Sequence, residues 1–316
     1  MKIAVVVPVY NEEENLPELA ERLRRTLDST GLAWTVLAVD DGSQDSSARM
    51  LAELSTRDPR FRFLSLSRNF GHQAAYTAGL RHVDAEAVIT LDADLQDPPE
   101  LIPDLVRAWR QGADVVLARR RSRAETGLRG LAFRTFHRIF HRLVDFPIPP
   151  NVGTFGLMSR RAVEAFCRLP ERHRFFPGLR AWIGFPVAWV DYDRQGRQGG
   201  EPKMDWFRLV SYALDGLFSF SRLPLRLLTW TGLAVSGLGF ALAVFFIAKR
   251  LLGLESAFTG FTTLVSVVSF LGGLQLVALG IVGEYVGRIY DEVKRRPLFL
   301  LREPPGEGSQ AGLQDP

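Results

Sequence analysis

Residues 2–27 read KIAVVVPVYNEEENLPELAERLRRTL, a continuous apolar run that leads through a short acidic loop into a segment with helical spacing. A strand that is covered on both faces is apolar at every position, and a helix that packs on a sheet buries one stripe. That stripe consists of Leu16, Leu19, Ala20, Leu23 and Leu27. The stretch therefore predicts one strand and one helix of an α/β sheet.

The same alternation continues along the chain to about residue 118. Further short apolar runs stand at 34–39, 61–66, 87–91 and 113–118. Strands that alternate with helices form βαβ units, so we predict a Rossmann-like α/β fold whose mostly parallel sheet has helices on both faces. Ligands of such sheets bind beyond the carboxyl ends of the strands, and the polar loops after each run are therefore the candidate sites.

Composition excludes several classes of protein. The 316 residues include 39 Lys and Arg against 35 Asp and Glu, and 47% are hydrophobic, which is too apolar for a disordered chain. The single cysteine, Cys167, excludes an internal disulfide and a multi-cysteine zinc site. The arginine-rich stretch 107–142 contains aromatic residues at helical spacing. This pattern favours anionic lipid over nucleic acid as a partner, the alternative being a solvated helix that covers the sheet.

Two stretches in the C-terminal third are long and apolar enough to span a membrane. Residues 227–248 and 261–283 each hold at least 22 residues without a formal charge. At 1.5 Å per residue either one exceeds the hydrocarbon thickness of ~30 Å. Because the outer flanks are more basic than the link between the stretches, we predict a two-helix transmembrane hairpin in the cytoplasmic membrane, with the large domain and the C-terminus in the cytoplasm.

These features predict four regions. They are a cytoplasmic α/β domain at 1–206, amphipathic juxtamembrane helices at 207–226, the hairpin at 227–283, and a cytoplasmic C-terminal helix with a disordered tail at 284–316. Glycines in the second apolar stretch permit close helix packing, from which we expect a homo-oligomer.

The loop after the run at 87–91 carries oxygen ligands at alternating positions. Asp92, Asp94 and Gln96 follow that run directly, and carboxylate and amide oxygens suit Mg²⁺ or Mn²⁺. Taken alone, the pattern is more typical of aspartates that cap the next helix. The carboxylates on the neighbouring loops favour the metal site.

Those neighbouring loops predict a nucleotide site. Glu12 follows the first run, and Asp40 and Asp41 follow the second. Carboxylates accept hydrogen bonds from a nucleobase and from ribose, and Pro8 and Tyr10 offer a flat apolar wall to the base. Each residue alone is also typical of a turn. Neither glycine-rich phosphate motif, GxGxxG or GxxxxGK[ST], occurs in the chain, so metal and arginine must meet the phosphate charge.

Several motifs, in order and spacing, resemble those of one family. They are VVVPVYNEEENL, VDDGSQDSS, SLSRNFGHQAAYTAGL, LDADLQDPPEL, GTFGLMSRR and GIVGEYVGRIYDEVKRRP. Together they cover about residues 1–302 and resemble family 2 glycosyltransferases of the polyprenyl-phosphate branch, the bactoprenol glucosyltransferase and dolichyl-phosphate mannosyltransferase type. The resemblance implies a GT-A type sheet and a metal-dependent hexosyltransferase.

The resemblance also implies roles for individual positions. The donor-binding matches are Pro8, Tyr10, Glu12, Asp40, Asp41 and Asp92, and the metal and diphosphate matches are Asp92, Asp94 and Gln96. The matches for the acceptor phosphate are Arg120, Arg134, Arg194, Arg197 and Lys203, the last three in the loop VDYDRQGRQGGEPKM. Of these, Asp92, Asp94 and Arg120 are the candidate catalytic residues. His72 lies in a motif as well, and we expect a structural role for it.

One position departs from the family pattern. Many relatives have an aspartate after the glycine of the GTFGLMSRR motif, where this chain has Thr154. A phosphate monoester has a second pKa of about 6, so a lipid phosphate is largely dianionic near pH 7 and needs no base to become a nucleophile. We therefore predict an inverting displacement that does not depend on a base, with Thr154 lining the site.

The resulting hypothesis is transfer of one hexose from a nucleotide sugar, with UDP-glucose favoured, to a polyprenyl phosphate at the cytoplasmic face of the membrane. Within enzymes, the alternatives are a GDP-mannose-dependent polyprenyl-phosphate mannosyltransferase and a glycosyltransferase with another lipid or a polysaccharide as acceptor. The alternative outside enzymes is a membrane scaffold with a vestigial nucleotide site.

Overall fold

The computed structural model describes residues 1–121, 152–172, 174–193, 223–252 and 261–302. The chain divides into two compact units. The first comprises Met1–Arg142, Phe146–Trp206 and Arg296–Pro316, and the second comprises Leu143–Asp145 and Phe207–Arg295.

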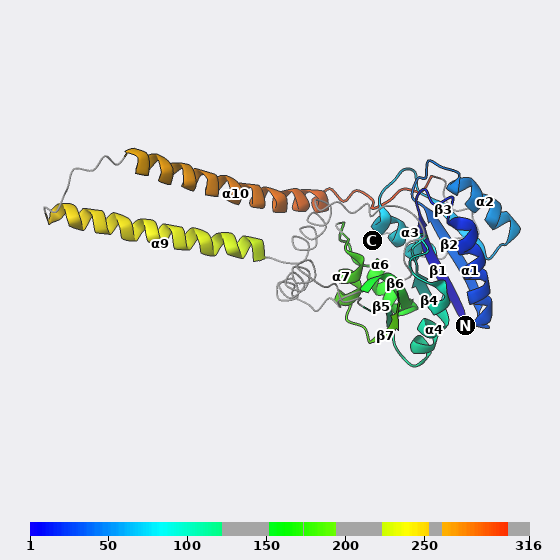
Figure 1. Ribbon diagram of the computed structural model, residues 1–316. Helices are drawn as coiled ribbons and strands as arrows, with labels where there is room; N and C mark the ends of the chain where they lie inside the picture. The colour runs from blue at the N-terminus through cyan, green and yellow to red at the C-terminus, as the bar shows by residue number, and fades with distance from the viewer. Residues whose placement is uncertain (122–151, 173, 194–222, 253–260, 303–316) are drawn as a thin grey trace. The chain divides into compact units, whose positions relative to one another are not determined.

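The first unit is built on a seven-stranded sheet with the order β3-β2-β1-β4-β6-β5-β7 (Figure 1). The strands are β1 (Lys2–Val9), β2 (Ala33–Asp40), β3 (Phe61–Ser65), β4 (Ala87–Thr90), β5 (Val115–Arg120), β6 (Val152–Ser159) and β7 (Val187–Tyr192). Only β6 runs antiparallel to its neighbours β4 and β5, and the other pairs are parallel. The predicted mostly parallel α/β sheet is thus confirmed.

Helices cover both faces of this sheet. They are α1 (Leu16–Ser29), α2 (Ser47–Arg57), α3 (His72–His82), η1 (Pro99–Leu101), α4 (Ile102–Arg110), α6 (Arg160–Cys167) and α7 (Phe176–Trp182). On one face, alternate residues of β1 share a buried core with the predicted stripe of α1, with Leu51 of α2 and with Ile102 of α4. On the other face α3 packs so closely on β1 that a Cβ at Gly79 would lie 2.2 Å from Val6 Cγ1.

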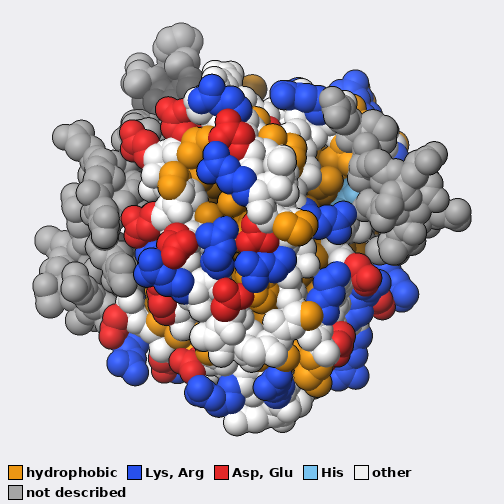
Figure 2. Space-filling view, turned by 90° about the vertical axis from the view of Figure 1, so that its right-hand side faces the viewer, with side chains coloured by type: hydrophobic (Ala, Val, Ile, Leu, Met, Phe, Trp, Pro, Cys, Tyr) orange, Lys and Arg blue, Asp and Glu red, His pale blue; other side chains and the backbone are white. Residues whose placement is uncertain are grey.

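The surface of the first unit mixes charges of both signs. On the face that Figure 2 displays, Asp and Glu side chains lie among Lys and Arg side chains, and no large area of a single sign stands out. Ion pairs of the first unit include Arg22 with Glu100, 2.7 Å apart, and Arg25 with Glu21, 2.8 Å apart. Solvent-exposed pairs such as the second contribute little to stability.

Two strands, β6 and β7, were not foreseen from the sequence as such. Residues 190–192, expected at the start of the acceptor-side loop, belong to β7, and residues 107–121 of the arginine-rich stretch lie largely in α4 and β5. The glycines in β6 break the apolar run that would have indicated a strand. Gly156 is needed there, because its Cβ would lie 2.5 Å from the Val116 carbonyl oxygen.

The second unit contains two long helices, α9 (Leu223–Leu251) and α10 (Phe261–Val293). Among the described residues, one segment meets the length and hydropathy expected of a membrane span: Phe270–Val293, with a mean hydropathy of 1.5 and no part buried. In α9 a shorter apolar segment, Leu228–Leu242, is found. One candidate span is therefore present where the sequence predicts 261–283, displaced toward the C-terminus, and the two-span hairpin stays a prediction. Of the amphipathic segment expected at 207–226, all but the first turn of α9 lies outside the described residues.

The segment that follows α10 belongs to the first unit. Leu301 forms an antiparallel bridge with Leu66 next to the end of β3. Ser67 N donates to Leu300 O at 2.8 Å, and Arg302 N donates to Ser65 O at 2.8 Å. Of the region expected from 284 onward, residues 284–302 comprise the last turns of α10 and a short strand-like segment on the edge of the sheet, and the expected tail after residue 302 lies outside the described residues.

Candidate functional site

The carboxyl ends of the parallel strands bring the predicted residues to one edge of the sheet. Tyr10 follows β1, Asp40 ends β2, and Asp92 follows β4. Arg120 ends β5, and Thr154 lies near the start of the antiparallel β6, which begins at this same edge. The topology therefore gathers residues that are up to 144 positions apart in the sequence.

Within the described ranges, Asp92 is held by three side chains, none of them a lysine or an arginine. Its Oδ1 lies 2.9 Å from His72 Nε2 and accepts a hydrogen bond from the Tyr76 hydroxyl at 2.7 Å. The Thr154 hydroxyl lies 3.2 Å from Oδ1 and 3.1 Å from Oδ2. Burial raises the pKa of Asp92, but the hydrogen bonds from His72, Tyr76 and Thr154 outweigh burial and hold the pKa below its usual value. The group is thus an anion at neutral pH.

The first turn of α3 supplies two of these donors. His72 and Tyr76 are four residues apart, so they lie on the same side of the helix, and their rings meet edge to face at 4.8 Å. Tyr76 is fully buried, and burial together with the charge of Asp92 raises its pKa well above its usual value. It therefore stays protonated and donates. His72, expected to be structural, contacts the predicted metal ligand directly.

The next carboxylates stand at the end of β2. Asp40 is completely buried, and its Oδ1 accepts a hydrogen bond from Ser43 N at 2.9 Å. Its Oδ2 has no hydrogen-bond partner among the residues that the structure describes. A buried carboxylate oxygen without a partner is costly, and a ligand N–H or O–H would satisfy it.

Asp41 holds a neighbouring loop. Its two oxygens accept hydrogen bonds from Phe70 N at 2.7 Å and Gly71 N at 2.9 Å. Burial raises the pKa of Asp41, and these two N–H groups oppose that shift. Gly71 has a φ of 96° and leads directly into α3. Asp41 thus links the end of β2 to the turn that positions His72.

The loop after β1 lines an open cleft of about 470 Å³. Its walls are Asn11, Glu12, Glu13, Glu14, Asn15, Gln44 and Asp45. Asn11 adopts a φ of 55°, and its side chain accepts a hydrogen bond from Gln44 N at 2.8 Å, which joins the first two loops. Tyr10 beside this cleft has 42% of its surface exposed, whereas Pro8 lies within β1 and is buried. An exposed ring beside acidic groups suits a nucleobase better than a buried proline does.

Arg120 belongs to a cluster of its own. Its Nε donates to the Tyr192 hydroxyl at 2.9 Å, and its Nη2 lies 3.3 Å from both oxygens of the buried Asp97. Tyr192 in turn donates to Asp97. Burial lowers the pKa of Arg120, but Asp97 and Tyr192 outweigh it and raise the pKa. A Cβ at position 153 would lie 3.2 Å from Arg120 Nη2, so Gly153 leaves room for the guanidinium.

The donor set fits a hard divalent cation. Asp94 Oδ1 accepts a hydrogen bond from Gln96 N at 3.2 Å across Leu95, whose φ of 58° is uncommon for a non-glycine residue. Within the described part of the chain, no group of three His, Cys, Asp or Glu side chains gathers as a closed metal site. Asp92, Asp94 and Gln96 are all oxygen donors of the kind that a hard divalent cation prefers, and the metal site that they were predicted to form stays a prediction.

Four of the predicted residues for the acceptor phosphate lie outside the described residues. They are Arg134, Arg194, Arg197 and Lys203. In return, the structure adds residues that the sequence did not indicate. Tyr76, Asp97, Arg180 and Tyr192 contact the predicted site residues, and for Tyr76 the spacing from His72 in HQAAY was the available signal.

Comparison with known proteins gives consistent matches. Residues 4–166 match the model of the family described as glycosyl transferase family 2. An uncharacterized glycosyltransferase of Synechocystis sp. is 43% identical over 96% of this chain and 95% of its own length. A prophage-derived bactoprenol glucosyl transferase of Shigella flexneri is 39% identical over 96% of this chain and 98% of its own. A prophage bactoprenol glucosyl transferase homolog of Escherichia coli is 38% identical over 96% of this chain and 99% of its own length.

Proposed function

The chain belongs to glycosyl transferase family 2, and on that premise we propose that it transfers one hexose from a nucleotide sugar to a polyprenyl phosphate. UDP-glucose is the favoured donor, and the products are a polyprenyl-phosphate hexose and a nucleoside diphosphate. The observation that carries the proposal is a pair of carboxylates, Asp40 and Asp92, that reach one sheet edge and have no arginine partner among the residues that the structure describes. The acceptor follows from the names of the Shigella and Escherichia relatives.

The nucleoside occupies the ends of β1 and β2. Asp40 Oδ2 accepts a hydrogen bond from the base or the ribose, which satisfies the buried oxygen. The exposed ring of Tyr10 packs against the base. Asp41 supports the site from behind, because its oxygens hold the loop that leads to His72.

The diphosphate lies at the loop after β4. Asp92, Asp94 and Gln96 would hold Mg²⁺ or Mn²⁺, which would supply positive charge against the departing diphosphate. The oxygen-only donor set supports this choice of ions over softer metals. Hydrogen bonds from His72, Tyr76 and Thr154 keep Asp92 ionised and in place for this task.

The displacement needs no protein base. An oxygen of the dianionic acceptor phosphate attacks the anomeric carbon from the side opposite the diphosphate and forms the new bond. The bond between the anomeric carbon and the diphosphate oxygen breaks, and its electron pair leaves with the diphosphate. The anomeric configuration inverts. Thr154 donates a hydrogen bond to Asp92 and takes no proton. Arg120, fixed through Nε and Nη2, meets the acceptor phosphate with Nη1.

The lipid acceptor places the reaction at a membrane. The candidate span in α10 supports attachment to a bilayer. We propose that α9 and α10 form the two-span hairpin with the first unit on the cytoplasmic side, where nucleotide sugars are available. The glycines of α10, such as Gly272 and Gly280, favour assembly into a homo-oligomer.

The test is transfer of labelled sugar into an organic-extractable lipid. Detergent-purified protein is incubated with undecaprenyl phosphate and a panel of UDP- and GDP-sugars, each with Mg²⁺, Mn²⁺ or a chelator. We expect label in the lipid phase from UDP-glucose, lost with the chelator. Label from GDP-mannose instead identifies the mannosyltransferase alternative. Hydrolysis of a donor without lipid label contradicts the acceptor, and neither transfer nor hydrolysis with any donor favours the scaffold.

A further inference from the structure

The two oxygens of Asp92 are not equivalent. Among the described residues, Oδ1 lies within hydrogen-bond distance of His72, Tyr76 and Thr154, whereas Oδ2 lies within such distance of Thr154 alone. The Thr154 hydroxyl has one proton and therefore donates to one oxygen at a time. When it donates to Oδ1, three donors saturate that oxygen and Oδ2 is left as the face that meets a cation.

The backbone at Thr154 is itself held by hydrogen bonds from two side chains. Its carbonyl oxygen accepts hydrogen bonds from Arg180 Nη1 at 3.1 Å and from the Thr90 hydroxyl at 2.5 Å. Arg180 Nη2 also donates to Gly153 O at 2.8 Å. One guanidinium thus binds two successive carbonyl groups and fixes the backbone that carries the Thr154 hydroxyl.

Arg180 is an unusual group to find at this place. Only 3% of its surface is exposed, and burial lowers the pKa of Arg180 to about 10. Among the described residues it makes no ion pair, and its guanidinium lies 5.4 Å from the ring of Phe176. Gly156 leaves room for it, because a Cβ there would lie 3.1 Å from Arg180 Nη1. A buried cation is costly, and the two carbonyl groups that Arg180 binds are the contacts that offset this cost.

We propose that Thr154 and Arg180 are positioning residues, which together direct Oδ2 of Asp92 toward the divalent cation of the donor complex. The inference rests on the proposed function, because the cation is what Asp92 holds there. Arg180 fixes the start of β6, Thr154 orients the carboxylate through its hydroxyl, and neither residue touches the substrate.

The experiment measures binding of Mn²⁺ to the full-length protein in detergent, with and without UDP, from the electron paramagnetic resonance signal of free Mn²⁺. Thr154→Val keeps the shape of the side chain and removes the hydroxyl, and we expect it to weaken Mn²⁺ binding roughly tenfold, the effect of one hydrogen bond to a charged group. Thr154→Ser restores the hydroxyl and should bind within about twofold of the unaltered protein. Arg180→Lys should fall between them, because one ammonium replaces a fork that binds two carbonyl groups.

The matched control is Thr77→Val. Thr77 is likewise a buried threonine, next to Tyr76, but its hydroxyl donates to Gln73 O within its own helix. It should leave Mn²⁺ binding unchanged. If Thr154→Val keeps its melting temperature and binds Mn²⁺ as tightly as Thr154→Ser, the positioning role is wrong while the metal site stands. If the unaltered protein does not bind Mn²⁺ even with UDP, the proposed cation site fails and this inference fails with it.

Discussion

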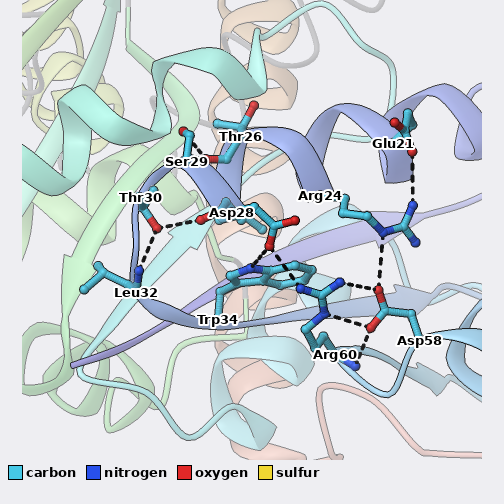
Figure 3. Close-up of polar contacts among 11 residues, drawn as sticks. Glu21, Arg24, Thr26, Asp28, Ser29, Thr30, Leu32, Trp34, Asp58 and Arg60 are labelled. Atoms are coloured by element: carbon cyan, nitrogen blue, oxygen red, sulfur yellow. Dashed lines mark hydrogen bonds and ion pairs between the residues drawn. The ribbon is translucent and has the colours of Figure 1, made fainter.

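The carboxylates near the two ends of β2 differ in their hydrogen-bond and ion-pair partners. At its start, Trp34 Nε1 donates to Asp28 at 2.9 Å, and Arg60 lies 4.0 Å above the Trp34 ring (Figure 3). Arg60 also donates to both oxygens of Asp58, at 2.9 and 2.8 Å. At the end of β2, Asp40 accepts one backbone N–H and has one oxygen without a partner among the described residues.

The difference lies in the counter-charge. At the start of β2 each carboxylate is already neutralised by a guanidinium, so it has little left to offer a cation or a nucleotide. At the other edge, Asp92 is held by His72, Tyr76 and Thr154, and no arginine in the described part of the chain pairs with it. The same residue type in the same sheet is therefore structural at one end and available for binding at the other.

Asp92→Asn should produce the largest effect. The amide keeps the shape of the side chain but removes the charge that binds the cation, so we expect kcat to fall by roughly 10²–10³-fold. The measurement is sugar transfer into lipid at saturating donor and Mn²⁺. Asp28→Asn, at the opposite end of the sheet, is the control and should leave kcat unchanged. If kcat fell equally in both variants, the functional difference between the two edges of the sheet would be wrong.

Asp40→Asn should have a smaller effect that falls on donor binding. The substitution weakens one hydrogen bond that the ligand donates to a charged, buried carboxylate. This corresponds to roughly a 10–100-fold rise in KM for the nucleotide sugar. KM and kcat are measured separately with the favoured donor, and UDP affinity is measured by calorimetry. If kcat falls and UDP affinity is unchanged, Asp40 acts elsewhere than in nucleoside binding.

Much of this contrast was accessible from the sequence, and part of it was not. The apolar runs predicted β1 to β5 and the loops that hold Asp40, Asp92 and Asp94, because strand and loop patterns are local. The support of Asp92 was not predicted. The Thr154 bond spans 62 positions and depends on β6, an antiparallel strand whose glycines weaken its apolar pattern. Contacts of this kind arise from topology, which no local pattern records.

Asp58→Asn should give the smallest effect, on stability alone. The hydrogen bond from Arg60 lowers the pKa of Asp58 to about 2. Because this lies below the unfolded value of 3.8, the stabilisation is complete above about pH 4 and is lost as the pH falls toward 2. After allowance for solvent screening at this surface site, we expect it to be worth about 1 kcal/mol at pH 7.

The measurement is the melting temperature of the purified protein between pH 7 and pH 3, with and without the substitution. The unaltered protein should lose more stability over the range from pH 4 to pH 3 than Asp58→Asn, whose side chain does not titrate. Transfer activity at pH 7 should be the same in both, since the Arg60 cluster lies at the end of β2 opposite Asp40. If the substitution did not alter the pH dependence of the melting temperature, solvent would screen the Asp58–Arg60 pair completely. The difference between the two ends of β2 would then be supported only by the residues at the binding edge.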